Sequence, residues 1–165
     1  MNEYLKYGGI LLVLILLQKT VISFIDVTEF RITPDLVLIG LVYVGIKRGK
    51  ITGSIAGFVS GLILDIFSFS FIGLMALSKT AAGFVSGFFN NEQKTERYLN
   101  SYIFIIIVSV CSVVNNIVYF TFYFQGTNLT FIDILIRYVL PTTVYTALFS
   151  IFPVIFAIFC IFFRY

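Results

Sequence analysis

The chain has 165 residues, of which 59% are hydrophobic and only 12% are charged, with a mean hydropathy of +1.03 and a formal net charge of +3. Soluble domains carry about 25% charged residues, so this composition predicts an integral membrane protein and excludes a nucleic-acid-binding surface. Histidine, the commonest proton shuttle and metal ligand, is absent. Because no serine–base pair, carboxylate pair or phosphate loop is found either, we expect neither an enzyme nor a bound cofactor or metal.

Six apolar runs predict an all-α protein with six transmembrane helices in one domain over residues 1–165, at about 7–24, 34–47, 51–67, 71–89, 101–124 and 138–163. The first run lacks a cleavage site of small residues, so we expect a retained anchor. The second is expected to begin with Thr33 as N-cap, Pro34 at the first helical position and Asp35 near the positive end of the helix dipole. Thr130 and Asp133 have capping-box spacing ahead of the last run.

The basic residues predict the orientation of the domain. With the N-terminus in the cytoplasm, most of them are cytoplasmic, namely Lys6, Lys47, Arg48, Lys50, Lys94, Arg97 and Arg164. Arg31 and Arg137 are then outside, and Lys19 is near the outer end of the first span. Since positive residues favour cytoplasmic loops, both termini are predicted to be cytoplasmic. The part of the last run up to Arg137 is expected to lie at the membrane interface.

A ladder of small residues marks the third and fourth runs. Gly53, Gly57 and Gly61 recur every four residues and end on Asp65, and glycines at this spacing let another backbone come close. The predicted contact residues of the two runs are Gly53, Gly57, Gly61, Asp65, Gly73, Lys79, Gly83 and Gly87. We expect them to pack spans three and four together, and the alternative is a docking face for a partner's helix.

Asp65 and Lys79 are ionisable residues within predicted spans, where a charge is costly and needs a partner. We expect a structural clamp, in which Asp65 accepts hydrogen bonds from the Lys79 ammonium or from backbone N–H groups at the start of the fourth span. The alternative is a substrate or proton site.

Asn115 and Asn116 lie in the middle of the fifth run, where amides tend to form hydrogen bonds across helices. Because consecutive helical positions point about 100° apart, we expect one amide to face the bundle and the other a partner. Pro141 and Pro153 are expected to bend the last span.

One set of residues resembles a known family. The set is Pro34-Asp35-Leu36, Tyr43, Gly57-Phe58, Gly61, Asp65, Gly73-Leu74, Ala76-Leu77 and Gly83-Phe84, and its order and spacing resemble the bacterial rod shape-determining protein MreD. The resemblance is good from about 33 to 90 and looser elsewhere. Lys79 is not charged in every member, and members often carry an acidic residue near Asn115 and Asn116, so the resemblance gives these residues no role.

The resemblance implies a non-enzymatic, multi-pass protein of the bacterial inner (cytoplasmic) membrane that serves cell elongation and cell shape. Its implied partner is an MreC-type protein with a single span and a large periplasmic domain. Through MreC it would be linked to the actin-like MreB filament, a RodA-type polymerase and a class B penicillin-binding transpeptidase, which act in peptidoglycan synthesis.

The resemblance also implies a fold similar to the S components of energy-coupling factor transporters. The alternative function is therefore a small-solute-binding membrane subunit of that type. The first span, however, reads Gly8-Gly9-Ile10-Leu11-Leu12-Val13 at its start and lacks the alanine-xxx-alanine face typical of S components.

Overall fold

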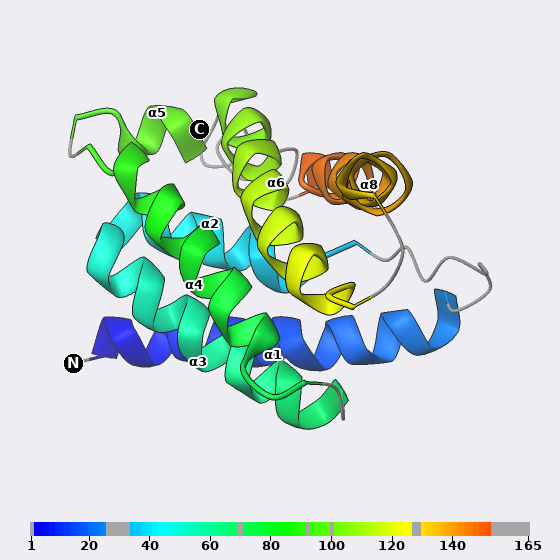
Figure 1. Ribbon diagram of the computed structural model, residues 1–165. Helices are drawn as coiled ribbons and strands as arrows, with labels where there is room; N and C mark the ends of the chain where they lie inside the picture. The colour runs from blue at the N-terminus through cyan, green and yellow to red at the C-terminus, as the bar shows by residue number, and fades with distance from the viewer. Residues whose placement is uncertain are drawn as a thin grey trace.

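The computed structural model describes residues 2–25, 34–68, 71–91, 93–99, 101–126 and 130–152, which form a bundle of helices (Figure 1). In chain order these are α1 (Asn2–Ile25), α2 (Leu36–Arg48), α3 (Lys50–Ser68), α4 (Leu74–Ser86), the 3-10 turn η1 (Gly87–Phe89), α5 (Thr95–Leu99), α6 (Ile103–Tyr123), α7 (Phe131–Ile134), the π-helical turn η2 (Leu135–Val139) and α8 (Leu140–Phe149). Each predicted apolar run contains a helix, and α5 is an additional short helix that the apolar pattern does not indicate.

Three of the described helices are long and apolar enough to cross a membrane: Lys50–Ser68, Ile103–Tyr123 and the continuous helix Phe131–Phe149, which comprises α7, η2 and α8. Tyr7–Thr20 and Leu74–Phe89 are shorter apolar helices. The protein is therefore helical with membrane-capable helices, while six crossings and cytoplasmic termini stay predictions.

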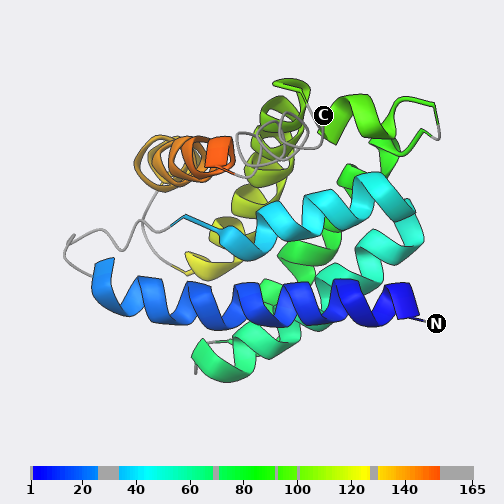
Figure 2. The ribbon, with the colours of Figure 1, turned by 180° about the vertical axis from the view of Figure 1, so that it is seen from behind.

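Helices α1 to α4 pack beside one another in chain order, each reversing the direction of the one before it. Figures 1 and 2 show α1 beside α2 and α3 beside α4, with α6 lying obliquely across α4. In both views α8 is seen nearly end-on while α1 lies across the picture, so the last helix crosses the first at a steep angle. The centre of the core is where α2 meets α6, and its fully buried side chains include Leu38, Leu41, Val42, Ile46 and Val108.

The loops between the helices are divided between the two ends of the bundle. The start of α1, the turn between α2 and α3, and the loop after η1 lie together at one end (Figure 1). There the Arg48 guanidinium lies 5.2 Å from the centroid of the Tyr7 ring. At the opposite end, the Lys19 ammonium donates a hydrogen bond to the Phe67 carbonyl at 3.1 Å. The predicted orientation requires the first set of loops to lie at one end of the bundle, as they do, and the assignment of that end to the cytoplasm stays a prediction.

Helix α2 begins later than predicted. Its N-cap is Asp35, whose carboxylate accepts the backbone N–H of Leu38 at 2.9 Å, and Pro34 precedes the helix. The predicted cap, Thr33, lies outside the described residues. A carboxylate both accepts an orphan N–H and neutralises the helix dipole, which explains why Asp35 takes the cap position.

The last helix is continuous where the sequence predicts a division. Thr130 occupies the predicted N-cap position, but its hydroxyl makes no capping hydrogen bond, so the capping box is not formed. The helix passes Arg137 without a break, through η2. Pro141 explains this turn, because it lacks an N–H and the carbonyl four residues earlier loses its α-helical donor. Pro153 and the rest of the predicted last span lie outside the described residues.

Candidate functional site

Five polar side chains, each from a different helix or its cap, make hydrogen bonds or an ion pair around the starts of α2 and α4, and we call this group the polar junction. They are Gln18 of α1, Asp35 at the start of α2, Asp65 of α3, Lys79 of α4 and Thr146 of α8. Asp65 and Thr146 have no exposed surface, and Lys79 and Gln18 are also buried. Because buried polar groups are costly unless they are bonded, their partners determine what the junction does.

Asp35 is the centre of the junction. One carboxylate oxygen caps α2, and the other forms an ion pair with the Lys79 ammonium. The side chains of Lys79 and Asp35 are only 4% and 14% exposed. The backbone N–H of Asp35 donates to the Thr146 hydroxyl at 3.2 Å, and Gln18 accepts the N–H of Val37 at 2.9 Å. The start of α2 is thus bonded to α1, α4 and α8.

Asp65 caps the start of α4 from the end of α3. Its carboxylate accepts the backbone N–H groups of Gly73, Met75 and Ala76 at 2.9, 3.0 and 3.1 Å. Gly73 has a φ of +100°, a left-handed conformation that suits glycine and turns the chain into α4.

The structure selects one of the two predicted partners of Asp65. Bonding to backbone donors at the start of the fourth helix is confirmed. Pairing with Lys79 is wrong, because the Lys79 ammonium reaches Asp35 instead. Both oxygens of Asp65 already accept N–H groups of the turn, whereas Asp35 has one oxygen left after capping α2, and the Lys79 ammonium bonds to that oxygen.

The glycine ladder packs α3 against α4. A Cβ added at Gly53 would lie 2.5 Å from the Gly83 carbonyl oxygen, and one at Gly57 would lie 2.3 Å from the Lys79 carbonyl oxygen. At Gly61 it would lie 2.4 Å from the Ala76 Cα. These distances are too short for any side chain. The ladder is therefore an internal packing face, which is the first of its two predicted uses, and its buried glycines are not left for a partner's helix.

Three further glycines differ in what they do: two of them allow close contact between helices, and one serves a turn. Gly87 also lies in close contact, since a Cβ there would be 2.3 Å from the Lys50 Cα, but Gly73 faces open space and serves the turn. Gly45 of α2 was not predicted, although a Cβ there would be 1.8 Å from the Ser86 hydroxyl oxygen. The contact of Gly45 with α4 was missed because the sequence analysis looked for glycines four residues apart, and Gly45 lies five residues after Gly40.

Asn115 and Asn116 both face the interior, with exposures of 5% and 4%, so the expectation that one would face a partner is wrong. Asn116 donates to the Ser112 hydroxyl at 3.3 Å and to the Thr143 hydroxyl of α8 at 3.2 Å, which confirms a hydrogen bond across helices. Asn115 donates to the Asn116 carbonyl oxygen at 3.3 Å. Its own carbonyl oxygen is buried and has no donor among the described residues.

The inner face of α8 is lined with hydroxyls, a feature that the sequence analysis missed. Thr143, Thr146 and Ser150 are buried, whereas Val144 and Leu148 on the other face are exposed. Thr143 contacts the α6 amides and Thr146 contacts the polar junction. The hydroxyl spacing of three and four residues in an apolar helix was the available signal. Hydrogen bonds from Thr143 and Thr146 therefore link α8 to α6 and to the start of α2.

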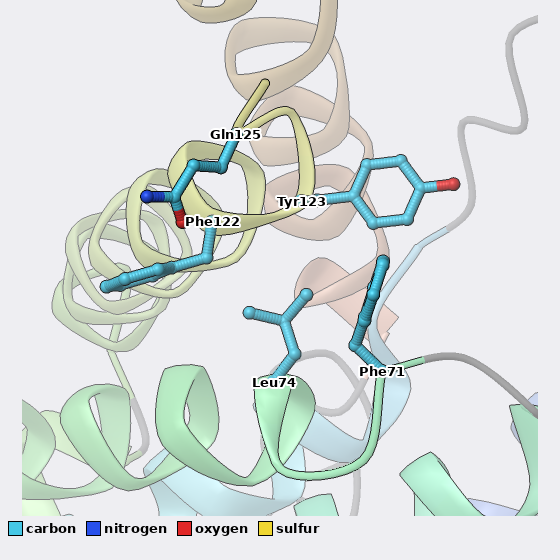
Figure 3. Close-up of a pocket in the computed structure, with 5 residues that line it drawn as sticks. All are labelled: Phe71, Leu74, Phe122, Tyr123 and Gln125. Carbon is cyan, nitrogen blue, oxygen red and sulfur yellow. The ribbon is translucent and has the colours of Figure 1, made fainter. Parts of the chain in front are cut away.

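A hollow opens at the end of the bundle away from the α2–α3 turn. It has a volume of about 410 Å³ and is lined by Phe71, Leu74, Phe122, Tyr123 and Gln125. Figure 3 shows Leu74 rising between Phe122 and the pair of rings of Phe71 and Tyr123, with the Tyr123 hydroxyl directed away. The lining is uncharged and mostly aromatic, so this hollow offers apolar contact and no acid–base pair.

The comparisons with known proteins give one match. The family model described as rod shape-determining protein MreD matches residues 5–165, which is nearly the whole chain. No curated protein and no solved structure matches the chain.

Proposed function

Because the chain belongs to the MreD family of rod shape-determining proteins, we propose that it is a multi-pass, non-enzymatic subunit of the elongation complex in the bacterial inner membrane. In this proposal it binds an MreC-type protein with a single span. It thereby helps to link the actin-like MreB filament to the RodA-type polymerase and the class B penicillin-binding transpeptidase. The observation that carries the proposal is the family match over residues 5–165.

The polar junction supports a role as a rigid framework. Each of its five side chains bonds to another helix or to the start of one, so these hydrogen bonds and the ion pair tie α1, α2, α3, α4 and α8 together. A reaction or transport site would instead need a polar group that is free to meet a substrate. A framework that holds a constant shape suits a protein whose task is to bind other chains.

The surface left for a partner's helix is apolar. The glycine ladder is buried, whereas Leu12 and Leu16 on α1 and Val144 and Leu148 on α8 are about half exposed. A single-span partner would therefore pack against medium and large side chains of these outer helices, in the part of the chain that the structure describes.

Co-purification tests the proposal. The full chain is tagged, extracted in mild detergent from cells that also produce the MreC-type protein, and analysed for bound chains and mass. We expect a stable complex with that partner. The matched control is an unrelated six-span protein with the same tag. Recovery of the chain alone, with the partner present in the extract, would contradict the proposal.

One observation favours the alternative of a small-solute-binding subunit. The buried Asn115 carbonyl oxygen has no donor among the described residues, and the neighbouring Asn116 contacts Thr143 on the hydroxyl-lined face of α8. A solute with a hydrogen-bond donor would satisfy the Asn115 oxygen. Native mass spectrometry of the purified chain would then show a bound small molecule that is lost in Asn115→Leu, whereas the scaffold proposal expects the two spectra to differ only by the substitution.

A further inference from the structure

We propose that the end of the bundle formed by the α2–α3 turn and α5 binds the headgroups of anionic phospholipids, while their acyl chains lie on the apolar surface beside it. We call this surface the basic end. Its basic residues are Lys47, Arg48, Lys50, Lys94 and Arg97. The proposal concerns lipid and not protein partners, so it is independent of the proposed function.

The charge at the basic end favours an anionic ligand. Lys50, Lys94 and Arg97 are exposed, and within the described residues no carboxylate forms an ion pair with them. Glu96 is the acidic residue described on α5. The first turn of α3 contains no acidic residue, so the positive end of its dipole adds to the potential of Lys50.

The cations of the two segments belong to one surface. The Asn90 side-chain amide donates to the Ile46 carbonyl at 2.7 Å, which holds the loop after η1 against the end of α2. Helices α2 and α5 are also in contact. A Cβ at Gly49 in the turn would lie 3.8 Å from Asn90. The basic residues on both sides of this contact therefore belong to the same end of the bundle.

An exposed apolar strip begins directly beside these charges. The Lys50 ammonium lies 3.6 Å from the centroid of the Phe88 ring. The rings of Phe88 and Phe84 form an edge-to-face pair at 5.1 Å, and both are about half exposed. Ile51, next to Lys50 in the chain, is 79% exposed. A phosphate at Lys50 would thus place an attached hydrocarbon chain next to Phe88, Phe84 and Ile51.

Because the basic residues lie beside an exposed apolar strip, the basic end suits a lipid better than a free anion. A soluble phosphate would gain from the charges but would leave the apolar strip without a partner. An anionic phospholipid satisfies both, because its headgroup attracts Lys and Arg and its chains contact apolar side chains. A zwitterionic lipid offers the same chains without net charge. The preference for the anionic over the zwitterionic lipid therefore measures how much the basic residues contribute to binding.

The test uses the full chain in vesicles that contain equal amounts of phosphatidylglycerol and phosphatidylcholine. Electron spin resonance measures how strongly spin-labelled forms of each lipid associate with the protein. The test variant is Lys50→Gln with Lys94→Gln and Arg97→Gln. Arg137→Gln removes an exposed charge away from the basic end and is the matched control. Lys50→Arg keeps the charge and checks that substitution at this position is tolerated.

We expect the natural chain, the Arg137 variant and Lys50→Arg to prefer phosphatidylglycerol, and the triple variant to lose this preference. The expected loss is about fivefold for each neutralised residue that contacts a headgroup. Equal association of the two lipids with the natural chain would overturn the proposal, as would an equal loss in the Arg137 variant. If inorganic phosphate abolishes the preference while chloride at the same ionic strength does not, the site binds free anions and the lipid proposal is wrong.

Discussion

Removing Lys79 would leave the Asp35 carboxylate buried without its cation. Breaking a fully buried ion pair at one partner costs about 3–5 kcal/mol. Asp35 is 14% exposed and keeps its bond to the Leu38 N–H, so we expect Lys79→Met to lower the free energy of unfolding by about 3 kcal/mol, the lower end of that range. Asp35→Asn keeps a residue that caps helices well, but it leaves the buried Lys79 ammonium without its carboxylate. Its cost in free energy of unfolding should therefore be similar.

The double variant separates the ion pair from other effects. Asp35→Asn with Lys79→Met removes both charges, and a neutral pair in place of a buried ion pair is often about as stable. We therefore expect the double variant to be more stable than either single variant, with a coupling energy of about 3 kcal/mol or more. The free energies are measured by reversible unfolding of the purified chain in mixed micelles, followed by far-ultraviolet circular dichroism.

A second cycle is the control. Asp65 bonds to three backbone N–H groups and not to Lys79, so Asp65→Asn and Lys79→Met should be additive within about 0.5 kcal/mol. If instead the Asp65–Lys79 coupling is the larger of the two, or the Asp35–Lys79 cycle is additive, the described network is not what stabilises the protein.

The remaining predictions concern packing and orientation. Gly57→Ala would place a Cβ 2.3 Å from the Lys79 carbonyl oxygen and should cost about 1–3 kcal/mol in the same unfolding assay. Gly9→Ala, which meets open space on α1, should instead stabilise by up to about 1 kcal/mol, and equal effects of the two changes would refute the packing argument. In a background without native cysteines, Gln125→Cys should react with an impermeant reagent applied from outside the cell and Lys94→Cys should not. The reverse pattern would invert the predicted topology.

Local features of the chain could be predicted from sequence because each depends on neighbouring residues. Apolar runs located the helices, since a long apolar run in contact with lipid must satisfy its backbone hydrogen bonds within the segment, which a helix does. The four-residue spacing of Gly53, Gly57 and Gly61 indicated a close helix contact, and α4 makes it. The bond from Asp65 to the start of α4 also follows from the short hairpin between them.

Contacts between distant segments could not be predicted in the same way. The partner of Lys79 is Asp35, 44 residues away, and the sequence favoured the nearer carboxylate of Asp65 because nothing in the chain showed that α2 starts beside α4. The inward direction of Thr143 and Thr146 depends on how α8 crosses the bundle, which a sequence period alone does not fix. The relative positions of these helices depend on tertiary packing, and they determine which polar groups come into contact.

On the scaffold proposal, the polar junction holds the helices in place and does not carry out chemistry or transport. The most direct test compares the membrane-inserted level of the chain and the shape of the cells when the only copy is natural, Lys79→Met, or Asp35→Asn with Lys79→Met. The scaffold account predicts that level and rod shape fall together in the single variant and recover together in the double variant. Normal level with loss of rod shape in the double variant would contradict it, because the charges would then be needed for function after the fold is restored.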